Sequence, residues 1–234
     1  TSVRSIIMLS EFTIRPQSSR RLSMADGYVT RLVKVAALLL ALIFAADTAQ
    51  AGQKVILTFG DSLTAGYGLP AADAFVARLQ AALRARGRNV RVRNGSVSGD
   101  TTAGGRARLA WTLSGQIDLV ILELGANDGL RGVDPGETRR NLDAMLTALG
   151  KRKITVLLAG MLAPPNLGPD YARDYNGLYP DLAKKHGVAL YPFFLEGVAA
   201  QAALNQPDGL PPNAAGVQVI VDAMTPHVLE LLNN

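Results

Sequence analysis

Four short polar segments of the sequence carry residue types that could do chemistry. They are residues 60–63 (Gly-Asp-Ser-Leu), 96–101 (Ser-Val-Ser-Gly-Asp-Thr), 125–128 (Gly-Ala-Asn-Asp) and 208–213 (Asp-Gly-Leu-Pro-Pro-Asn). The first three each follow a predicted strand, and the fourth precedes the last predicted helix. In open α/β sheets, ligands bind outside the carboxyl ends of the strands. The four segments are therefore predicted to meet at one edge of a sheet.

The chemistry that these segments suggest is nucleophilic attack by a serine. Ser62 would be the nucleophile, and we expect no other serine near it. The backbone N–H groups of Ser62 and Gly99 and the side chain of Asn127 would donate hydrogen bonds to a developing oxyanion. Taken singly, each segment also fits an ordinary turn or helix cap. Four of them at successive strand ends favour a catalytic site over unrelated turns.

These motifs resemble those of the SGNH (GDSL-type) hydrolases, and most closely those of the small exported bacterial arylesterases, acyl-thioesterases and lysophospholipases. Residues 60–63 match the first block, which carries the nucleophile, while Gly99 stands in the second block and Asn127 in the third. The resemblance covers nearly all of residues 54–234. It implies a flavodoxin-like three-layer α/β/α sandwich that cleaves esters or thioesters through an acyl-enzyme, with no metal and no organic cofactor.

The fourth block departs from the family pattern, which is Asp-x-x-His with the histidine as general base and the aspartate orienting it. Here Asp208 is present, but Pro211 stands at the histidine position. Proline has no titratable group and cannot take the proton from Ser62. His186 is expected at the opposite edge of the sheet and His227 well inside the last helix, so we predict structural roles for both.

Two interpretations therefore stay open. The chain is either an exported ester or thioester hydrolase whose Pro211 reflects a one-base change or a sequence error, or a catalytically impaired pseudoenzyme that binds acyl or aromatic ligands. A carbohydrate deacetylase lies within the reach of the family, but no feature of the sequence favours it. Residues 161–179 contain three prolines and three tyrosines. They could wall an acyl pocket or form an ordinary long loop.

Alternating strands and helices must position these residues. The expected strands are residues 55–59, 90–93, 119–124, 154–159 and 188–191, and the expected helices are residues 75–86, 101–113, 135–149, 171–185 and 214–232. Short apolar runs alternating with helical patterns of ten or more residues are typical of βαβ units. The sequence thus predicts a single α/β domain with a five-stranded parallel sheet covered on both faces. The order of the strands does not follow from the pattern.

The composition excludes several classes of site. The chain of 234 residues has no cysteine, which rules out disulfides, thiolate zinc sites and cysteine nucleophiles, and two histidines argue against a histidine metal centre. Residues 52–234 hold 18 basic and 16 acidic residues, so the net charge indicates no nucleic-acid partner. The arginine-rich run at 84–93 is interpreted as the solvated end of a helix and a strand. A small ester, thioester or lipid is the predicted partner, and the oligomeric state is not indicated.

The first 51 residues have the pattern of a targeting segment. Arg31 and Lys34 precede an uncharged apolar run at 35–46, and an Ala-Gln-Ala cleavage signal follows at 49–51. This pattern predicts a signal peptide over residues 24–51, cleaved after Ala51, and a periplasmic or secreted location. The run is shorter than the roughly 20 residues that span a membrane, so no stable anchor is expected. Residues 1–23, upstream of Met24, are interpreted as an over-extended or non-native leader.

Overall fold

The computed structural model describes residues 52–207 and 209–233. Residues from Gly52 onward form a compact unit by themselves. The predicted leader over residues 1–23, the predicted signal peptide over residues 24–51 and Asp208 lie outside the described residues.

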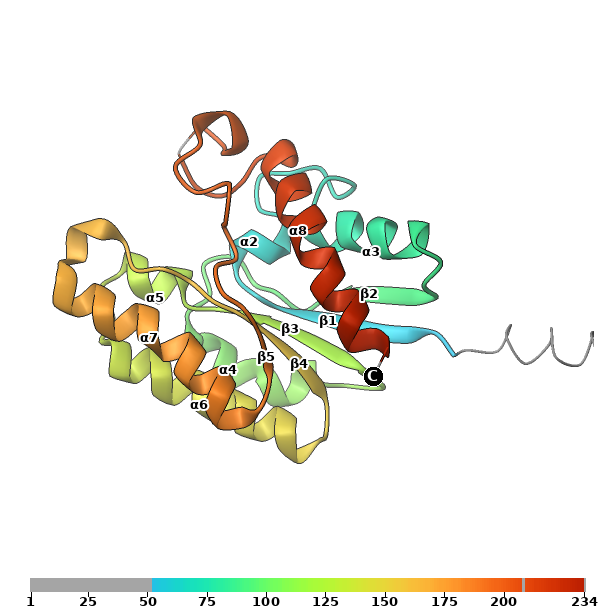
Figure 1. Ribbon diagram of the computed structural model, residues 1–234, viewed down its shortest axis with the longest axis horizontal. Helices are drawn as coiled ribbons and strands as arrows, with labels where there is room; N and C mark the ends of the chain where they lie inside the picture. Colours follow the sequence, from blue (N-terminus) through green and yellow to red (C-terminus); the bar gives the residue numbers. More distant parts are fainter. Residues whose placement is uncertain (1–51, 208, 234) are drawn as a thin grey trace, which may run out of the picture. The chain divides into compact units, whose positions relative to one another are not determined.

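A five-stranded, all-parallel sheet forms the centre of this unit (Figure 1). The strands are β1 (Lys54–Gly60), β2 (Val90–Asn94), β3 (Leu119–Glu123), β4 (Thr155–Ala159) and β5 (Ala189–Tyr191). Their spatial order is β2-β1-β3-β4-β5, which is the flavodoxin-like order. The side chains of β3 are fully buried, as expected for a strand covered on both faces. The predicted α/β/α sandwich is confirmed, and the strand order is now established.

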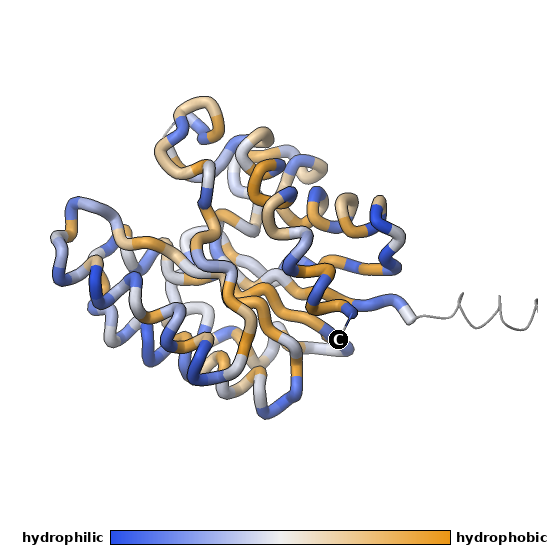
Figure 2. The backbone as a smooth tube through the Cα atoms, in the orientation of Figure 1, coloured by the Kyte–Doolittle hydropathy of each residue, from blue (hydrophilic) through white to orange (hydrophobic). Residues whose placement is uncertain are grey.

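Helices cover both faces of the sheet. Helices α3 (Phe75–Ala85) and α8 (Ala214–Asn233) pack together on one face, and α4 (Thr102–Thr112), α6 (Pro135–Lys151) and α7 (Pro169–His186) lie on the other (Figure 1). Figure 2 shows apolar strands between helices whose outer faces are polar. Two further helices, α2 (Ser62–Ala65) and α5 (Ala126–Leu130), are one turn long and follow β1 and β3. The described part also contains two short 3-10 helices, Pro165–Leu167 and Ala202–Leu204.

Helix α8 is the one helix in the described part that is long and apolar enough to cross a membrane. Its apolar side packs in the core instead, where Val217, Ile220, Val221, Met224 and Val228 are buried. By length and composition alone, a core helix of a globular protein passes the same test as a membrane span.

The outer edge of β2 is covered by side chains of helix α3. The Val92 N–H donates to Gln80 Oε1 at 2.9 Å, and Arg84 Nε donates to the Val90 carbonyl at 3.1 Å. These contacts occupy backbone groups that a neighbouring strand would otherwise use. At the other edge of the sheet, β5 has only three residues.

The strand order fixes where a ligand can bind. Strands β1 and β3 are neighbours, and Gly60 at the end of β1 lies opposite Glu123 at the end of β3. The chain leaves β1 toward α3 on one face of the sheet and leaves β3 toward α6 on the other face. The loops therefore separate at this point and leave a crevice at the carboxyl ends of the strands. Helices α2 and α5, which carry Ser62 and Asn127, flank this crevice.

Candidate active site

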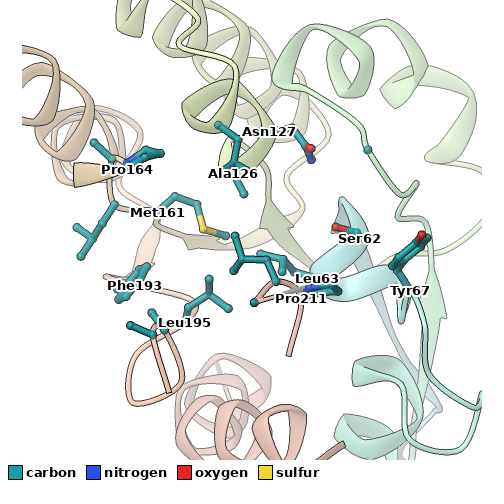
Figure 3. Close-up of a pocket in the computed structure, with 18 of the residues that line it drawn as sticks. Ser62, Leu63, Tyr67, Ala126, Asn127, Met161, Pro164, Phe193, Leu195 and Pro211 are labelled. Atoms are coloured by element: carbon teal, nitrogen blue, oxygen red, sulfur yellow. The ribbon is translucent and has the colours of Figure 1, made fainter. Parts of the chain in front are cut away.

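A cavity of about 760 Å³ opens at the carboxyl edge of the sheet. Ser62, Asn127 and Pro211 line it (Figure 3), as does Gly99. The structure thus brings together four segments that are far apart in the sequence. Asp208, the predicted partner of the missing base, lies outside the described residues.

The remainder of the cavity wall is mostly apolar. Figure 3 shows Ser62, Asn127 and Tyr67 toward one side, and Met161, Phe193 and Leu195 toward the other. Residues 161–165 belong to this wall, so the first part of the long segment after β4 does border a pocket. No Asp, Glu, Lys, Arg or His is among the described residues that line the cavity.

Ser62 occupies the first position of helix α2. The Asp61 side chain caps the helix by accepting the Leu63 N–H at 3.0 Å, and Gly66 ends the helix in a left-handed conformation. The N–H groups of the first turn of a helix have no partner within the helix. The Ser62 N–H is therefore available to an anion bound beside the hydroxyl, and the Ser62 hydroxyl has no hydrogen-bond partner among the described residues.

Gly99 lies in the loop after β2, whose path is set by two backbone hydrogen bonds. The Val97 N–H donates to the Gly60 carbonyl at 3.1 Å, and the Asp100 N–H donates to the Val97 carbonyl at 3.1 Å. Gly99 has a φ of 80°, whereas a Cβ there would meet nothing within 4 Å. The backbone conformation, not a lack of space, favours glycine at this position.

Asn127 is the second residue of helix α5. Its Nδ2 donates both to Asp61 Oδ2 at 3.0 Å and to the Asp100 carbonyl at 2.9 Å. These bonds link the three blocks to one another. They also use both amide hydrogens, so donation to an oxyanion requires Asn127 to exchange one of them.

Arg108 of helix α4 forms hydrogen bonds with the first block and with the loop that contains the second block. Its guanidinium donates to Asp100 Oδ2 at 2.6 Å, to the Gly60 carbonyl at 3.0 Å and to the Gly95 carbonyl. It also lies 4.0 Å from the centre of the Phe59 ring. The side chain is buried, so its charge is stabilised by these contacts and not by water.

Three buried carboxyl groups, those of Asp61, Glu123 and Asp128, lie beneath the site. Burial raises the pKa of Asp61 to about 7 and holds the pKa of Glu123 well above its usual range, with the negative charge of Asp61 adding to the effect on Glu123. Glu123 Oε2 accepts hydrogen bonds from Thr64 Oγ1 at 2.9 Å and from the Asp61 N–H at 3.3 Å. Glu123 Oε1 is buried without a partner. The raised pKa values of Asp61 and Glu123 favour the protonated form of these two carboxyls below neutral pH.

Asp128 anchors the third block to the helices below it. Its Oδ2 accepts the Thr102 N–H at 2.8 Å, and its Oδ1 accepts the hydroxyls of Thr102 at 2.5 Å and Thr138 at 3.2 Å. Helix α5 is thereby tied to the first turn of α4 and to α6. The Asp128 side chain points away from the cavity, which it does not line.

Neither histidine borders the cavity. His186 Nε2 lies 2.6 Å from Asp143 Oδ1, between α6 and α7. The His227 ring packs edge-on against Tyr191 at 5.3 Å between ring centres. Both positions agree with the predicted structural roles, and neither residue can replace the base missing at Pro211.

One expectation about the site is wrong. Ser98 also lines the cavity, so Ser62 is not the only serine there. The loop after β2 turns at Gly99, and this turn brings Ser98 to the cavity wall beside it. Ser98 lies in the turn of this loop, whereas Ser62 starts a helix whose first-turn N–H groups lack partners within the helix.

Sequence reasoning missed Arg108 and Glu123. A signal was present for each: Glu123 ends an otherwise apolar strand, and Arg108 stands beside Leu109 and three residues after Gly105, both of which are buried. Charged residues at core positions are seldom buried without a partner.

The predicted absence of a metal or cofactor remains a prediction, although no cluster of three potential metal ligands occurs in the described residues.

A family model described as the GDSL-like lipase/acylhydrolase family matches residues 58–219. The esterase TesA of Pseudomonas aeruginosa is 40% identical over 186 residues, which are 79% of this chain and 92% of the relative. The arylesterase of Vibrio mimicus is 41% identical over 174 residues, 74% of this chain and 87% of the relative. Thioesterase 1/protease 1/lysophospholipase L1 of Escherichia coli K12 is 37% identical over 185 residues, which are 79% of this chain and 88% of the relative.

Among solved structures, the SGNH-hydrolase family esterase AlinE4 is 48% identical with a TM-score of 0.66. The match covers 78% of this chain and 98% of that chain. A protein made almost entirely of the matched part thus folds by itself. The unit from Gly52 onward is accordingly expected to fold without the preceding residues.

Replacing Arg108 by methionine should destabilise the protein severely. The change leaves the Asp100 carboxylate and the Gly95 carbonyl without this donor, and the Gly60 carbonyl keeps only the Val97 N–H. Breaking a buried ion pair in this way costs on the order of 3–5 kcal/mol. Urea denaturation measures the loss. Arg91→Met, at an exposed position of β2, should change the free energy of unfolding by about 0.5 kcal/mol or less, and an equal loss in both variants would contradict the role given to Arg108.

The protein should lose stability as the pH rises from about 4 to about 7. The folded state binds protons more strongly than the unfolded chain in that interval, because the pKa values of Asp61 and Glu123 are raised from 3.8 and 4.5. Glu123→Gln removes one of these titrations and should make the free energy of unfolding less dependent on pH between pH 5 and pH 8. The control is Glu137→Gln on the surface, which should leave the pH dependence unchanged. If the Glu123→Gln protein keeps the full pH dependence of the free energy of unfolding, that dependence comes from other groups.

Proposed function

The chain belongs to the GDSL-like lipase/acylhydrolase family and is a carboxylic-ester hydrolase of the SGNH type; from this premise we propose that Ser62 is its nucleophile and that its substrates are esters or thioesters with an apolar acyl or aryl group. The observation that carries the proposal is the position of Ser62 in an otherwise largely apolar cavity, next to Gly99 and Asn127. The cavity offers a nucleophile at one side and room for an apolar group at the other.

The proposed reaction has two steps. Ser62 Oγ attacks the acyl carbon while its proton passes to a base, and the carbonyl oxygen becomes an oxyanion. The N–H groups of Ser62 and Gly99 and Nδ2 of Asn127 donate to that oxyanion. The tetrahedral intermediate then expels the alcohol or thiol, which takes up a proton. Water attacks the remaining acyl-enzyme, releases the carboxylic acid and restores the Ser62 hydroxyl.

The names of the relatives support the substrate class. The Vibrio mimicus relative is an arylesterase, and the Escherichia coli relative is a thioesterase and lysophospholipase. Each of these names describes cleavage at an acyl carbonyl carbon. The apolar wall formed by Met161, Phe193 and Leu195 can hold the hydrocarbon part of any of these substrates.

The proposed reaction needs a group that takes the proton of the Ser62 hydroxyl. Pro211 lines the cavity where the family has its base, and no described residue on the cavity wall can take the proton at neutral pH. We therefore propose that turnover by this sequence is slow. The second candidate function follows from the same observation: a catalytically impaired protein that binds acyl or aromatic ligands in the cavity without hydrolysing them.

Restoring the base tests both candidates. The unaltered protein should hydrolyse p-nitrophenyl butyrate very slowly, because losing the base of a serine triad costs on the order of 10⁶ in turnover. Pro211→His should raise kcat/KM by roughly 10³-fold or more. The Pro211 carbonyl accepts the Gln206 N–H at 2.9 Å, a contact that involves only backbone atoms.

Three control variants accompany this experiment. Pro211→Ala should give no gain, since it removes the proline without adding a base. In the Pro211→His protein, Ser62→Ala should abolish the gain and Asp208→Asn should remove much of it. Fast, Ser62-dependent hydrolysis by the unaltered protein would show that another group is the base.

We also propose that the protein is exported and that residues 24–51 are removed. The support is the pattern of Arg31 and Lys34, the apolar run at 35–46 and the Ala-Gln-Ala signal. The processed chain would then begin at Gly52, where the compact unit also begins, and would carry no stable anchor.

Export is tested on protein produced with its full leader. The intact mass and the first residues of the periplasmic or secreted fraction should correspond to a chain that starts at Gly52. Changing Ala51 to a bulky residue should block processing, because the cleavage site needs small side chains. A mature protein that retains residues 35–46 would identify the apolar run as an anchor.

A further inference from the structure

In the described part of the chain, the exposed large apolar side chains are concentrated in one region. Seven such side chains are exposed in this described part, and five of them lie in the segments that follow the strands at the carboxyl edge of the sheet. Each of the five strands is followed by one of them: Tyr67 after β1, Val97 after β2, Leu130 after β3, Leu162 after β4 and Leu210 after β5. We call these five residues the apolar ring. Their exposed fractions range from 39% to 58%.

The apolar ring surrounds the mouth of the cavity. Tyr67, Leu130, Leu162 and Leu210 each line the cavity while remaining exposed. Val97 directly precedes Ser98 and Gly99, which also line it. The exposed surface outside is thus continuous with the apolar wall inside. Exposed apolar surface of this kind, gathered at one site, marks a surface that binds another apolar one.

A cation stands beside the apolar ring. Arg131 follows Leu130 directly, is itself exposed, and its Nη2 donates to the Gly99 carbonyl at 3.0 Å. An apolar surface with a guanidinium at its border matches the chemistry of a phospholipid, in which a phosphate lies next to hydrocarbon.

The shape of the surface favours lipid over a second copy of the chain. The apolar ring encloses a hollow of about 760 Å³. An acyl chain from a lipid surface can enter that hollow, whereas two rings placed against each other would leave both hollows unfilled. Empty apolar space forfeits the contacts that stabilise an interface.

We propose that the apolar ring is a docking surface for aggregated phospholipid. The five loops rest on the surface of a vesicle or micelle, Arg131 contacts phosphate groups, and an acyl chain passes into the cavity without crossing water. Because this inference rests on the proposed function for the entry of an acyl chain, docking must be measured without turnover.

The test measures cosedimentation of the chain from Gly52 onward with sucrose-loaded vesicles of phosphatidylcholine. The unaltered protein should bind the vesicles, and Leu130→Gln with Leu162→Gln should weaken binding by about tenfold or more, since burying one leucine contributes on the order of tenfold. Tyr67→Ser should weaken it as well. All of these side chains are exposed, so the variants should keep the thermal stability of the parent.

Trp111→Gln is the matched control. Trp111 is the most exposed large apolar residue of the described part, at 71%, and lies in the last turn of α4, whose first turn follows the loop of Gly99. Its removal should leave vesicle binding unchanged. The proposal is overturned if the unaltered protein does not bind, if Trp111→Gln loses as much binding as the ring variants, or if the ring variants convert a dimer to a monomer in sedimentation velocity.

The docking test and the hydrolysis test can fail separately. Hydrolysis of a soluble short-chain ester by the Pro211→His protein reports only on the proposed function. Ester hydrolysis without vesicle binding would reject the docking surface alone. Vesicle binding combined with no Ser62-dependent hydrolysis by the Pro211→His protein would reject the proposed nucleophile and leave the docking surface standing.

Discussion

The guanidinium of Arg108 is the interaction on which the site most depends. A buried arginine is tolerated only when its donors are satisfied, and here they are satisfied by the Asp100 carboxylate and by the carbonyls of Gly60 and Gly95. Gly60 belongs to the first block and Asp100 to the second, and Gly95 directly precedes the second block. The free-energy cost of burying the charge is offset only when both loops adopt this arrangement. The path of the chain on either side of Ser62 is therefore coupled to a residue that does not line the cavity.

A second constraint comes from the carboxyl groups beneath the cavity. Asp61 caps the helix of Ser62 and binds Asn127, while Glu123 holds the Asp61 backbone from the neighbouring strand. Burial of these groups costs stability that a purely apolar core would keep. In return, the crevice between β1 and β3 has polar contacts that fix its geometry. Asp61 and the Asp100 carbonyl together occupy both amide hydrogens of Asn127, so oxyanion binding and the resting hydrogen bonds compete for one side chain.

Much of this arrangement could be predicted from the sequence because it is local. The five strands are short apolar runs, and three of the four blocks follow strands directly, so their meeting at one edge follows from the geometry of parallel sheets. Strand order could not be predicted, because it depends on packing between distant segments. The one-turn helices at Ser62 and Ala126 were missed since they are too short to show a periodic pattern. Arg108 was missed because its acceptors, apart from Asp100, are backbone carbonyls, which are the same for every residue type.

The treatment of the sheet edges bears on the solubility of the folded protein. An open edge strand can act as a template for another chain, and proteins avoid this with short strands, charges or covering groups. Here β5 offers only three residues, and β2 has its Val90 and Val92 backbone groups already bonded to Arg84 and Gln80, with Arg91 exposed beside them. Polymerisation through strand pairing is thus hindered at both edges. The segments most able to form intermolecular β-structure are β1, β3 and β4, which stay in the interior, so aggregation on heating should follow unfolding and not precede it.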